Sequence, residues 1–305
     1  MSVLADSSIR QTTAPRKFWA IAGFLLLCLS WGATWLPLKH GIAQVPPLLF
    51  VASRFLAGGL VLWLAGGCAR PPALAALWPG AILMIAANYG LMAWGTVRVP
   101  SGLAATVNFA TIPLAILLLA GRRPRLGQIA ALILGAAGLA VLCLAGNSGL
   151  DRGAPAGVGA IALGAACYGL GTVHLKATTI APRPISLAAW HSLAGGALLL
   201  GLSGFVEPWD GAIWNRFTAP AALLDWTVLV CLSTVVGSSL YLALLRLWPA
   251  SAVASYAYVC PVVALTLGML IDGERPGETQ WLASLLLIVA AALALIPFPK
   301  PKETS

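Results

Sequence analysis

The residues of this sequence that could do chemistry are few, and they stand inside long apolar runs. Arg54 and His191 are the two titratable side chains that we expect deepest in such runs. A charge at membrane depth is costly unless it faces the protein interior. Arg54 is therefore either a counter-ion for a substrate carboxylate or a structural residue bonded to backbone carbonyls. His191 is either part of a proton relay or a core histidine with satisfied hydrogen bonds.

Polar and aromatic side chains in other apolar runs add hydrogen-bonding groups and stacking surfaces. Hydrocarbon offers such groups no partners, so most should face inward, either to a shared cavity or to neighbouring helices. We predict that a subset binds or gates a small solute: Trp31, Asn88, Tyr89, Trp94, Asn108, Tyr168, Ser239, Tyr241, Tyr256 and Tyr258. The alternative for the polar members is helix packing, and for Trp94 it is anchoring at the membrane interface.

The sequence shows no signature of an enzyme, a metal site or a cofactor. The stretch from Gly157 to Ala162 imitates a dinucleotide-binding glycine pattern, but it opens an apolar run and follows no strand. The six cysteines lack metal-ligand or redox spacing and are interpreted as small core residues. No Asp or Glu lies in the core of a predicted span, which argues against a proton-coupled exporter of drug cations.

The elements that must position these residues are membrane-spanning helices. Of 305 residues, 60% are hydrophobic and 9% are charged, whereas a soluble domain has about 25% charged residues. A spanning helix needs about 20 mainly apolar residues. Breaks at Pro, Gly and charged residues give ten spans, at 18–38, 48–66, 74–95, 100–120, 127–145, 156–175, 185–204, 222–246, 249–271 and 279–297. The sequence therefore predicts an all-α integral membrane protein with terminal tails at 1–17 and 298–305.

The placement of Lys and Arg predicts the orientation of these spans. With the N-terminus inside, most basic residues fall in inner segments, and most acidic residues fall in outer ones. The positive-inside rule then puts both termini in the cytoplasm, as an even number of spans requires. Because the basic groups form no continuous surface, we expect no binding to nucleic acid.

The chain also repeats itself. The stretch Ser30 to Lys39 aligns with Cys167 to Lys176 at an offset of 137, and at that offset Arg54 meets His191. Later equivalences, such as Pro113 with Pro261, follow at an offset of about 148. We therefore predict two five-helix repeats, at 18–145 and 156–297. Because five is odd, the repeats enter the membrane from opposite sides, as in many secondary transporters.

These motifs resemble the EamA-type permeases of the drug/metabolite transporter superfamily. The resemblance rests on Trp31-Gly32 near the end of the first span, on Arg54-Phe55 in the second, and on Tyr241 to Pro261 followed by Asp272 to Pro276. It covers about 18–297. It implies ten helices in two inverted repeats and transport of metabolites, often amino acids and often outward. One departure is Gly121-Arg122, where the family usually has Gly-Glu.

We therefore predict a permease of the cytoplasmic membrane that exports a small polar metabolite, an amino acid or related carboxylate, by alternating access. Gly32 and Gly169 should permit close helix approach, and Trp31 and Tyr168 should flank a central cavity as outer and inner gates. The predicted partners are a small-molecule substrate and the lipid bilayer, with the chain a monomer or homodimer. The alternatives are export of drug-like or other metabolites and a membrane scaffold that does not transport.

Overall fold

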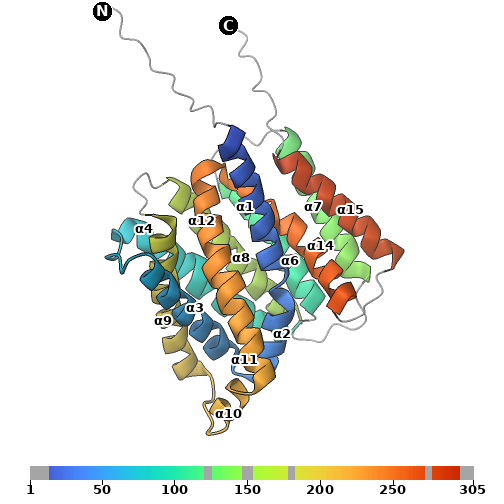
Figure 1. Cartoon of the computed structure of the whole chain (residues 1–305). Helices are drawn as coiled ribbons and strands as arrows, with labels where there is room; N and C mark the ends of the chain where they lie inside the picture. Colours follow the sequence, from blue (N-terminus) through green and yellow to red (C-terminus); the bar gives the residue numbers. More distant parts are fainter. Residues whose placement is uncertain are drawn as a thin grey trace, which may run out of the picture.

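A computed structural model of the chain describes residues 14–99, 101–119, 126–145, 154–177, 183–271 and 277–295. Every regular element within those ranges is a helix (Figure 1). The first-half helices are α1 (Ala14–Gly32), α2 (Trp35–Gln44), α3 (Pro47–Ala65), α4 (Leu74–Trp78), η1 (Pro79–Ala87), α5 (Asn88–Thr96), α6 (Ser101–Leu119) and α7 (Leu126–Ala145). The second-half helices are α8 (Ala154–Ala177), α9 (Pro184–Val206), α10 (Ile213–Phe217), α11 (Pro220–Val228), η2 (Leu229–Gly237), α12 (Ser238–Leu247), α13 (Ala250–Val253), α14 (Tyr256–Ile271) and α15 (Glu278–Leu295).

Among the residues that the structure describes, six helical stretches are long and apolar enough to cross a membrane. They are Phe18–Gln44, Pro47–Ala65, Leu74–Thr96, Pro155–Ala177, Pro184–Val206 and Pro220–Leu247. The four remaining predicted spans coincide with shorter apolar helices, at Val107–Leu119, Leu126–Gly138, Ala250–Ala264 and Trp281–Ala290. The prediction of an all-α membrane protein is confirmed. The count of ten crossings stays a prediction, because among the described residues only six stretches are both long and apolar enough to cross.

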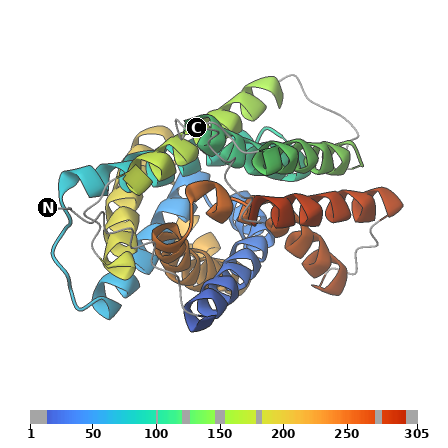
Figure 2. The same cartoon turned by 90° about the horizontal axis from the view of Figure 1, so that it is seen from above.

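The helices form one bundle in which the start of α1 and the end of α15 lie at the same end (Figure 1). Helices α7 and α15 pack side by side along one flank, as both views show (Figures 1 and 2). Helix α3 packs along α9, and helices η2, α12 and α14 surround α1. Residues from α1, α8, η2, α12 and α14 consequently meet in the interior.

Equivalent glycines lie where the helices approach most closely. A Cβ added at Gly59 would lie 2.9 Å from a backbone nitrogen of α9, and one at Gly196 would lie 3.1 Å from a backbone nitrogen of α3. A Cβ added at Gly32 would lie 2.6 Å from a side chain of α14, and one at Gly169 would lie 2.7 Å from a side chain of α6. The close approach predicted at Gly32 and Gly169 is therefore confirmed, since neither position has space for a larger residue.

The α3–α9 pair is fastened at both ends by hydrogen bonds. The carboxylate of Glu207, which follows α9, accepts bonds of 2.7 and 3.0 Å from two backbone N–H groups in the first turn of α3. Such groups have no partner within their own helix, and a carboxylate there also complements the helix dipole. Near the other end, the Ala69 carbonyl accepts bonds from the indole N–H groups of Trp63 and Trp190.

Two features of the backbone were not predicted. The third predicted span of each half contains a nine-residue π-helical segment, η1 in the first half and η2 in the second. Such segments are rare and are frequent at functional sites. In addition, the first predicted span is broken at Ala33–Thr34, between α1 and α2, whereas its counterpart α8 continues through all 24 of its residues.

Candidate functional site

Four aromatic side chains form a cluster in the middle of the bundle. The ring of Trp31, at the end of α1, lies 4.7 Å from the ring of Tyr256, 5.3 Å from that of Tyr241 and 6.5 Å from that of Tyr168. Tyr241 also lies within 6 Å of both other tyrosines. These centroid separations are typical of favourable edge and tilted ring contacts. Residues from α1, α8, α12 and α14 thus meet at one point, which we call the aromatic cluster.

Hydrogen bonds hold the aromatic cluster in place. The indole N–H of Trp31 donates to the Ser233 carbonyl over 3.1 Å, and Ser233 belongs to the π-helical segment η2. Gly237 makes space for this indole, because a Cβ at that position would overlap its Nε1 atom. The hydroxyl of Tyr241 pairs with the buried hydroxyl of Thr172 over 2.7 Å. The orientations of Trp31 and Tyr241 are therefore both specified.

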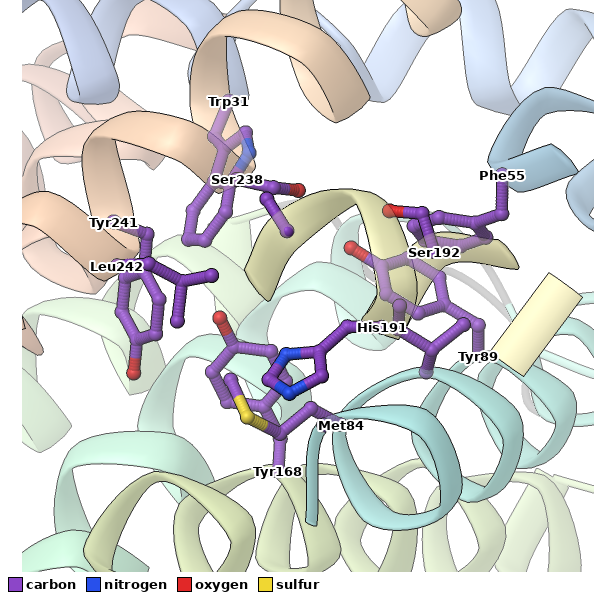
Figure 3. Close-up of a pocket in the computed structure, with 13 residues that line it drawn as sticks. Trp31, Phe55, Met84, Tyr89, Tyr168, His191, Ser192, Ser238, Tyr241 and Leu242 are labelled. Carbon is purple, nitrogen blue, oxygen red and sulfur yellow. The ribbon is translucent and has the colours of Figure 1, made fainter. Parts of the chain in front are cut away.

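Two small cavities adjoin the aromatic cluster. The first has a volume of about 40 Å³, and the second has about 60 Å³. Each has room for only a few water molecules. Trp31, Tyr89 and Tyr168 line both cavities. Figure 3 shows the first cavity, with Trp31 and Tyr241 on one side, Phe55, Tyr89 and Ser192 on the other, and Met84 and His191 between. A larger solute could enter only if these side chains moved.

Arg54 lies behind the walls of these cavities. Its side chain is 1% exposed, and its guanidinium lies 4.6 Å from the ring centroid of Phe55 and 4.8 Å from that of Tyr89. Its Nη1 atom donates a long bond of 3.4 Å to the hydroxyl of Ser233. Within the described ranges its Nε and Nη2 atoms have no hydrogen-bond partner, and no carboxylate forms an ion pair with it. A buried cation with so few partners is unusual and calls for a functional reason.

His191, the repeat partner of Arg54, has a different environment. It lines the first cavity, is 4% exposed, and its Nε2 atom hydrogen-bonds to the Ala76 carbonyl of α4 over 2.7 Å. The ring fits over Gly80, where a Cβ would overlap it. This bond agrees with a core histidine that has a partner, although the side chain still contacts the cavity.

The structure brings together most of the predicted site residues. Those that line a cavity are Trp31, Asn88, Tyr89, Asn108, Tyr168, His191, Tyr241 and Tyr256. Trp31 and Tyr168, which were predicted to flank a central cavity as gates, line both cavities and also contact one another within the cluster. Their gating role stays a prediction. This contact between the two rings could not be predicted from the lengths of the spans, because it depends on how α1 and α8 are placed relative to one another along the bundle.

Three predicted residues lie elsewhere. Trp94 is 45% exposed, and the guanidinium of Arg98 lies 3.6 Å from its ring centroid, as expected for the interfacial alternative. Tyr258 packs against Gly135 of α7. The Ser239 hydroxyl is buried without a hydrogen-bond partner in the described ranges, but its neighbour Ser238 is the residue that lines the first cavity.

Several contributors were missed. Ser233 contacts both Trp31 and Arg54, Thr172 orients Tyr241, and Phe55 and Met84 line the first cavity. Ser233 could have been found, because residues four apart share a helix face and Gly237 and Tyr241 continue its row. No group of three or more metal-ligating side chains occurs among the residues that the structure describes.

Comparison with known proteins assigns the family. The family model described as "EamA-like transporter family" matches the chain twice, at residues 18–144 and 155–296. The chain belongs to this family of membrane transporters, and the resemblance noted from its motifs is confirmed. It is a multi-pass protein of the inner membrane, where it contacts lipid and a transported substrate.

Individual relatives agree with this assignment. The chain is 30% identical to the "Uncharacterized inner membrane transporter YedA" of Escherichia coli (strain K12), with 88% of each chain covered. It is 34% identical to the "Uncharacterized transporter YvbV" of Bacillus subtilis (strain 168), with 87% of each covered. A "Probable amino-acid metabolite efflux pump" of Salmonella typhimurium is 28% identical, over 87% of this chain and 91% of that protein.

A solved crystal structure shares the fold. Its chain is 22% identical to this one and superposes with a TM-score of 0.71, over 91% of this chain and 96% of its own.

Proposed function

We propose that this protein is a secondary transporter that exports a small polar metabolite, an amino acid or related carboxylate, by alternating access. The observation that carries the proposal is Arg54, a buried cation directly behind the cavity-lining rings of Phe55 and Tyr89, two of whose nitrogens have no hydrogen-bond partner among the residues that the structure describes. A substrate carboxylate would supply the missing acceptors in a strong bidentate geometry. A related protein bears the name of an amino-acid metabolite efflux pump, and this supports both the substrate class and the outward direction.

The architecture that we propose is ten spans in two inverted repeats, 18–145 and 156–297, with both termini in the cytoplasm. The two separate matches to the family model support the division. The equivalent glycine contacts and the equivalent π-helical segments support the repeat, and the distribution of Lys and Arg supports the orientation. Because one chain contains both cavities and the aromatic cluster, either a monomer or a homodimer would be sufficient for transport. We assign no catalytic residue to this protein.

In this proposal the aromatic cluster is the gate. Trp31 and Tyr168 line both cavities, and their ring centroids lie 6.5 Å apart, which supports this role. Rotation of the rings would join one cavity to the substrate path, and the break between α1 and α2 gives Trp31 a place to move. Because the Nε2–H group of His191 donates to the Ala76 carbonyl, the nitrogen of His191 that would accept a proton is Nδ1.

The test is transport by purified protein in liposomes, across a panel of amino acids and related carboxylates. Wild-type protein should accelerate the flux of at least one compound. Arg54→Lys should fold and alter substrate affinity, because lysine keeps the charge but loses the planar fork of donors. Arg54→Met should lower transport by about a hundredfold or more, the loss of a charge-assisted pair of about 3 kcal/mol.

The melting temperatures of Arg54 variants distinguish a role of Arg54 in substrate binding from a structural role. If Arg54 serves the substrate, Arg54→Met should leave the melting temperature unchanged or raise it, because it removes a buried and poorly paired charge. If instead Arg54→Met unfolds the protein while Arg54→Lys transports normally, Arg54 is structural. A folded wild-type protein that moves none of the panel would favour the scaffold alternative.

A further inference from the structure

Ser233 bonds to two of the residues on which the proposed function depends. It lies in the π-helical segment η2 and is 5% exposed. Its carbonyl accepts the bond of 3.1 Å from the Trp31 indole, and its hydroxyl accepts the bond of 3.4 Å from the Nη1 atom of Arg54. One residue of the second half therefore holds α1 and α3 of the first half at the same time.

The backbone around Ser233 fits closely to the indole of Trp31. The Ser233 carbonyl also accepts a bond from the N–H of Ser238, five residues further on, as is typical of a π-helical turn. A Cβ at Gly237 would overlap the Nε1 atom of Trp31, so the indole fits only because this residue is a glycine. A displacement of Ser233 must therefore move Trp31 or break its hydrogen bond.

The hydroxyl of Ser233 makes its position depend on Arg54. In the described ranges the Nε and Nη2 atoms of Arg54 have no hydrogen-bond partner, so an anion would engage these two atoms first. The Nη1 atom, which bonds to Ser233, belongs to the same rigid guanidinium plane. A guanidinium that turns toward an anion consequently also moves the atom that bonds to Ser233.

The first half has no equivalent of this arrangement. Its π-helical segment η1 has the sequence PGAILMIAA, which contains no hydroxyl side chain. His191, the repeat partner of Arg54, bonds instead to the Ala76 carbonyl of α4. Of the two π-helical segments, only η2 therefore joins a buried titratable side chain to the aromatic cluster through a hydroxyl.

We propose that Ser233 is a positioning residue that couples the state of Arg54 to the position of Trp31. When an anionic group engages the guanidinium, Arg54 displaces Ser233, and the indole loses the place that η2 gives it. The rings of the aromatic cluster then separate. Coupling requires an element that both sites influence, and Ser233 is such an element. The inference rests on the proposed function for the roles of Arg54 and Trp31, and it adds the residue that connects them.

Fluorine NMR on the detergent-solubilised full chain tests this coupling without a substrate. The tryptophans are replaced by 5-fluorotryptophan, and the Trp31 resonance is assigned by its loss in Trp31→Phe. Arg54→Met should shift this resonance, because it removes the donor to the Ser233 hydroxyl. Ser233→Ala lacks the hydroxyl but keeps the carbonyl. In that background, Arg54→Met should produce no more than about half of the shift, because the two residues are no longer coupled.

Matched variants show whether the hydroxyl is the cause. Ser233→Thr retains a hydroxyl and should retain the full shift. Ser239→Ala removes another buried hydroxyl, which has no hydrogen-bond partner in the described ranges, and it should also leave the shift unchanged. If Ser233→Ala does not fold, Ser233→Cys takes its place, because a thiol of similar size is a weak acceptor.

Transport in liposomes distinguishes coupling from a structural role. The compound is the one that wild-type protein moves fastest in the panel of amino acids and carboxylates. Ser233→Ala should lower its maximal flux about fivefold, which is the order of one hydrogen bond. The half-saturating concentration should change by no more than about twofold, because Arg54 can still bind the compound. A structural role would instead lower the amount of folded protein and leave the flux per folded molecule unchanged.

The outcomes separate this inference from the proposed function. A Trp31 resonance that does not respond to Arg54→Met would overturn the coupling and leave the transporter standing. A resonance that shifts equally with and without the Ser233 hydroxyl would do the same. Unchanged flux per folded molecule in Ser233→Ala would also overturn the coupling. Failure of wild-type protein to move any compound of the panel would overturn the proposed function, while the fluorine experiment would still decide the coupling.

Discussion

The two halves of the molecule share a backbone plan but differ in their central chemistry. Arg54 and His191 occupy equivalent helices and are 1% and 4% exposed. His191 is bonded to a backbone carbonyl, whereas Arg54 has one long bond and two nitrogens without partners in the described ranges. One half thus contains a buried imidazole with a hydrogen-bond partner, where the other contains a buried cation that is only partly hydrogen-bonded within the described ranges. If the halves are repeats, as we propose, the helix contacts are kept while each half specialises its buried polar side chains.

The first helix of one half also differs from that of the other half. Helix α8 is continuous, but α1 ends at Gly32 and α2 starts at Trp35. Next to this break, the Thr34 hydroxyl donates to the Trp31 carbonyl over 2.9 Å. A break with a side-chain bond in place of a helical one is a natural hinge. We therefore expect the half that contains Arg54 to move more than the other half.

The largest expected effect tests the shared backbone plan. Gly59→Val and Gly196→Val should each destabilise the protein by about 3 kcal/mol, because the added side chain would overlap the backbone of the neighbouring helix. Thermal unfolding in detergent measures both, with Gly204→Val as a control at an uncrowded helix position. A large loss at one glycine and none at the other would show that the α3–α9 contact is not symmetric.

The next effect tests the aromatic cluster as a gate. Trp31→Ala and Tyr168→Ala should each change transport rates by about tenfold, equivalent to about 1.4 kcal/mol. Trp31→Ala should have the greater effect, because Trp31 also bonds to Ser233 in η2. Flux into liposomes measures both. Wild-type kinetics in both variants would refute the gate.

A smaller effect on transport tests the contrast between Arg54 and His191. His191→Leu removes the bond to Ala76 and should cost about 1 to 3 kcal/mol of stability, because the carbonyl loses its donor. Transport should change less than threefold, unlike the loss expected for Arg54→Met. Melting temperature and flux are measured on the same preparation. Abolished transport in a stable His191→Leu protein would instead support a proton relay.

The smallest effect is expected at Trp94. Trp94→Ala should change stability by no more than about 0.5 kcal/mol and leave transport intact, because its ring is 45% exposed and lies outside both cavities. The matched comparison is Trp31→Ala, a change of the same size at the cluster. A transport defect in Trp94→Ala would extend the site beyond the two cavities.

The part of the candidate site that could be predicted was identified from how deep its residues lie within apolar runs. Arg54, His191, Asn88 and Asn108 were identifiable because a polar group at membrane depth must face inward. Trp94, Tyr258 and Ser239 were grouped with them by the same rule, but depth does not specify which inward surface a side chain meets. Tyr258 faces α7, and Ser238 lines the cavity in place of Ser239.

The sequence by itself determined the membrane environment, the helical class, the internal repeat and the family, because these follow from local hydrophobicity, charge placement and motif spacing. The tertiary structure alone decided that Trp31 meets Tyr168 and that Ser233 joins Trp31 to Arg54. It also decided that, in the described ranges, two nitrogens of Arg54 have no hydrogen-bond partner whereas His191 bonds to a backbone carbonyl. These contacts depend on the rotation and depth of packed helices. The π-helical segments and the break after α1 alter both the rotation and the depth of these helices. Neither the segments nor the break was apparent from the apolar runs.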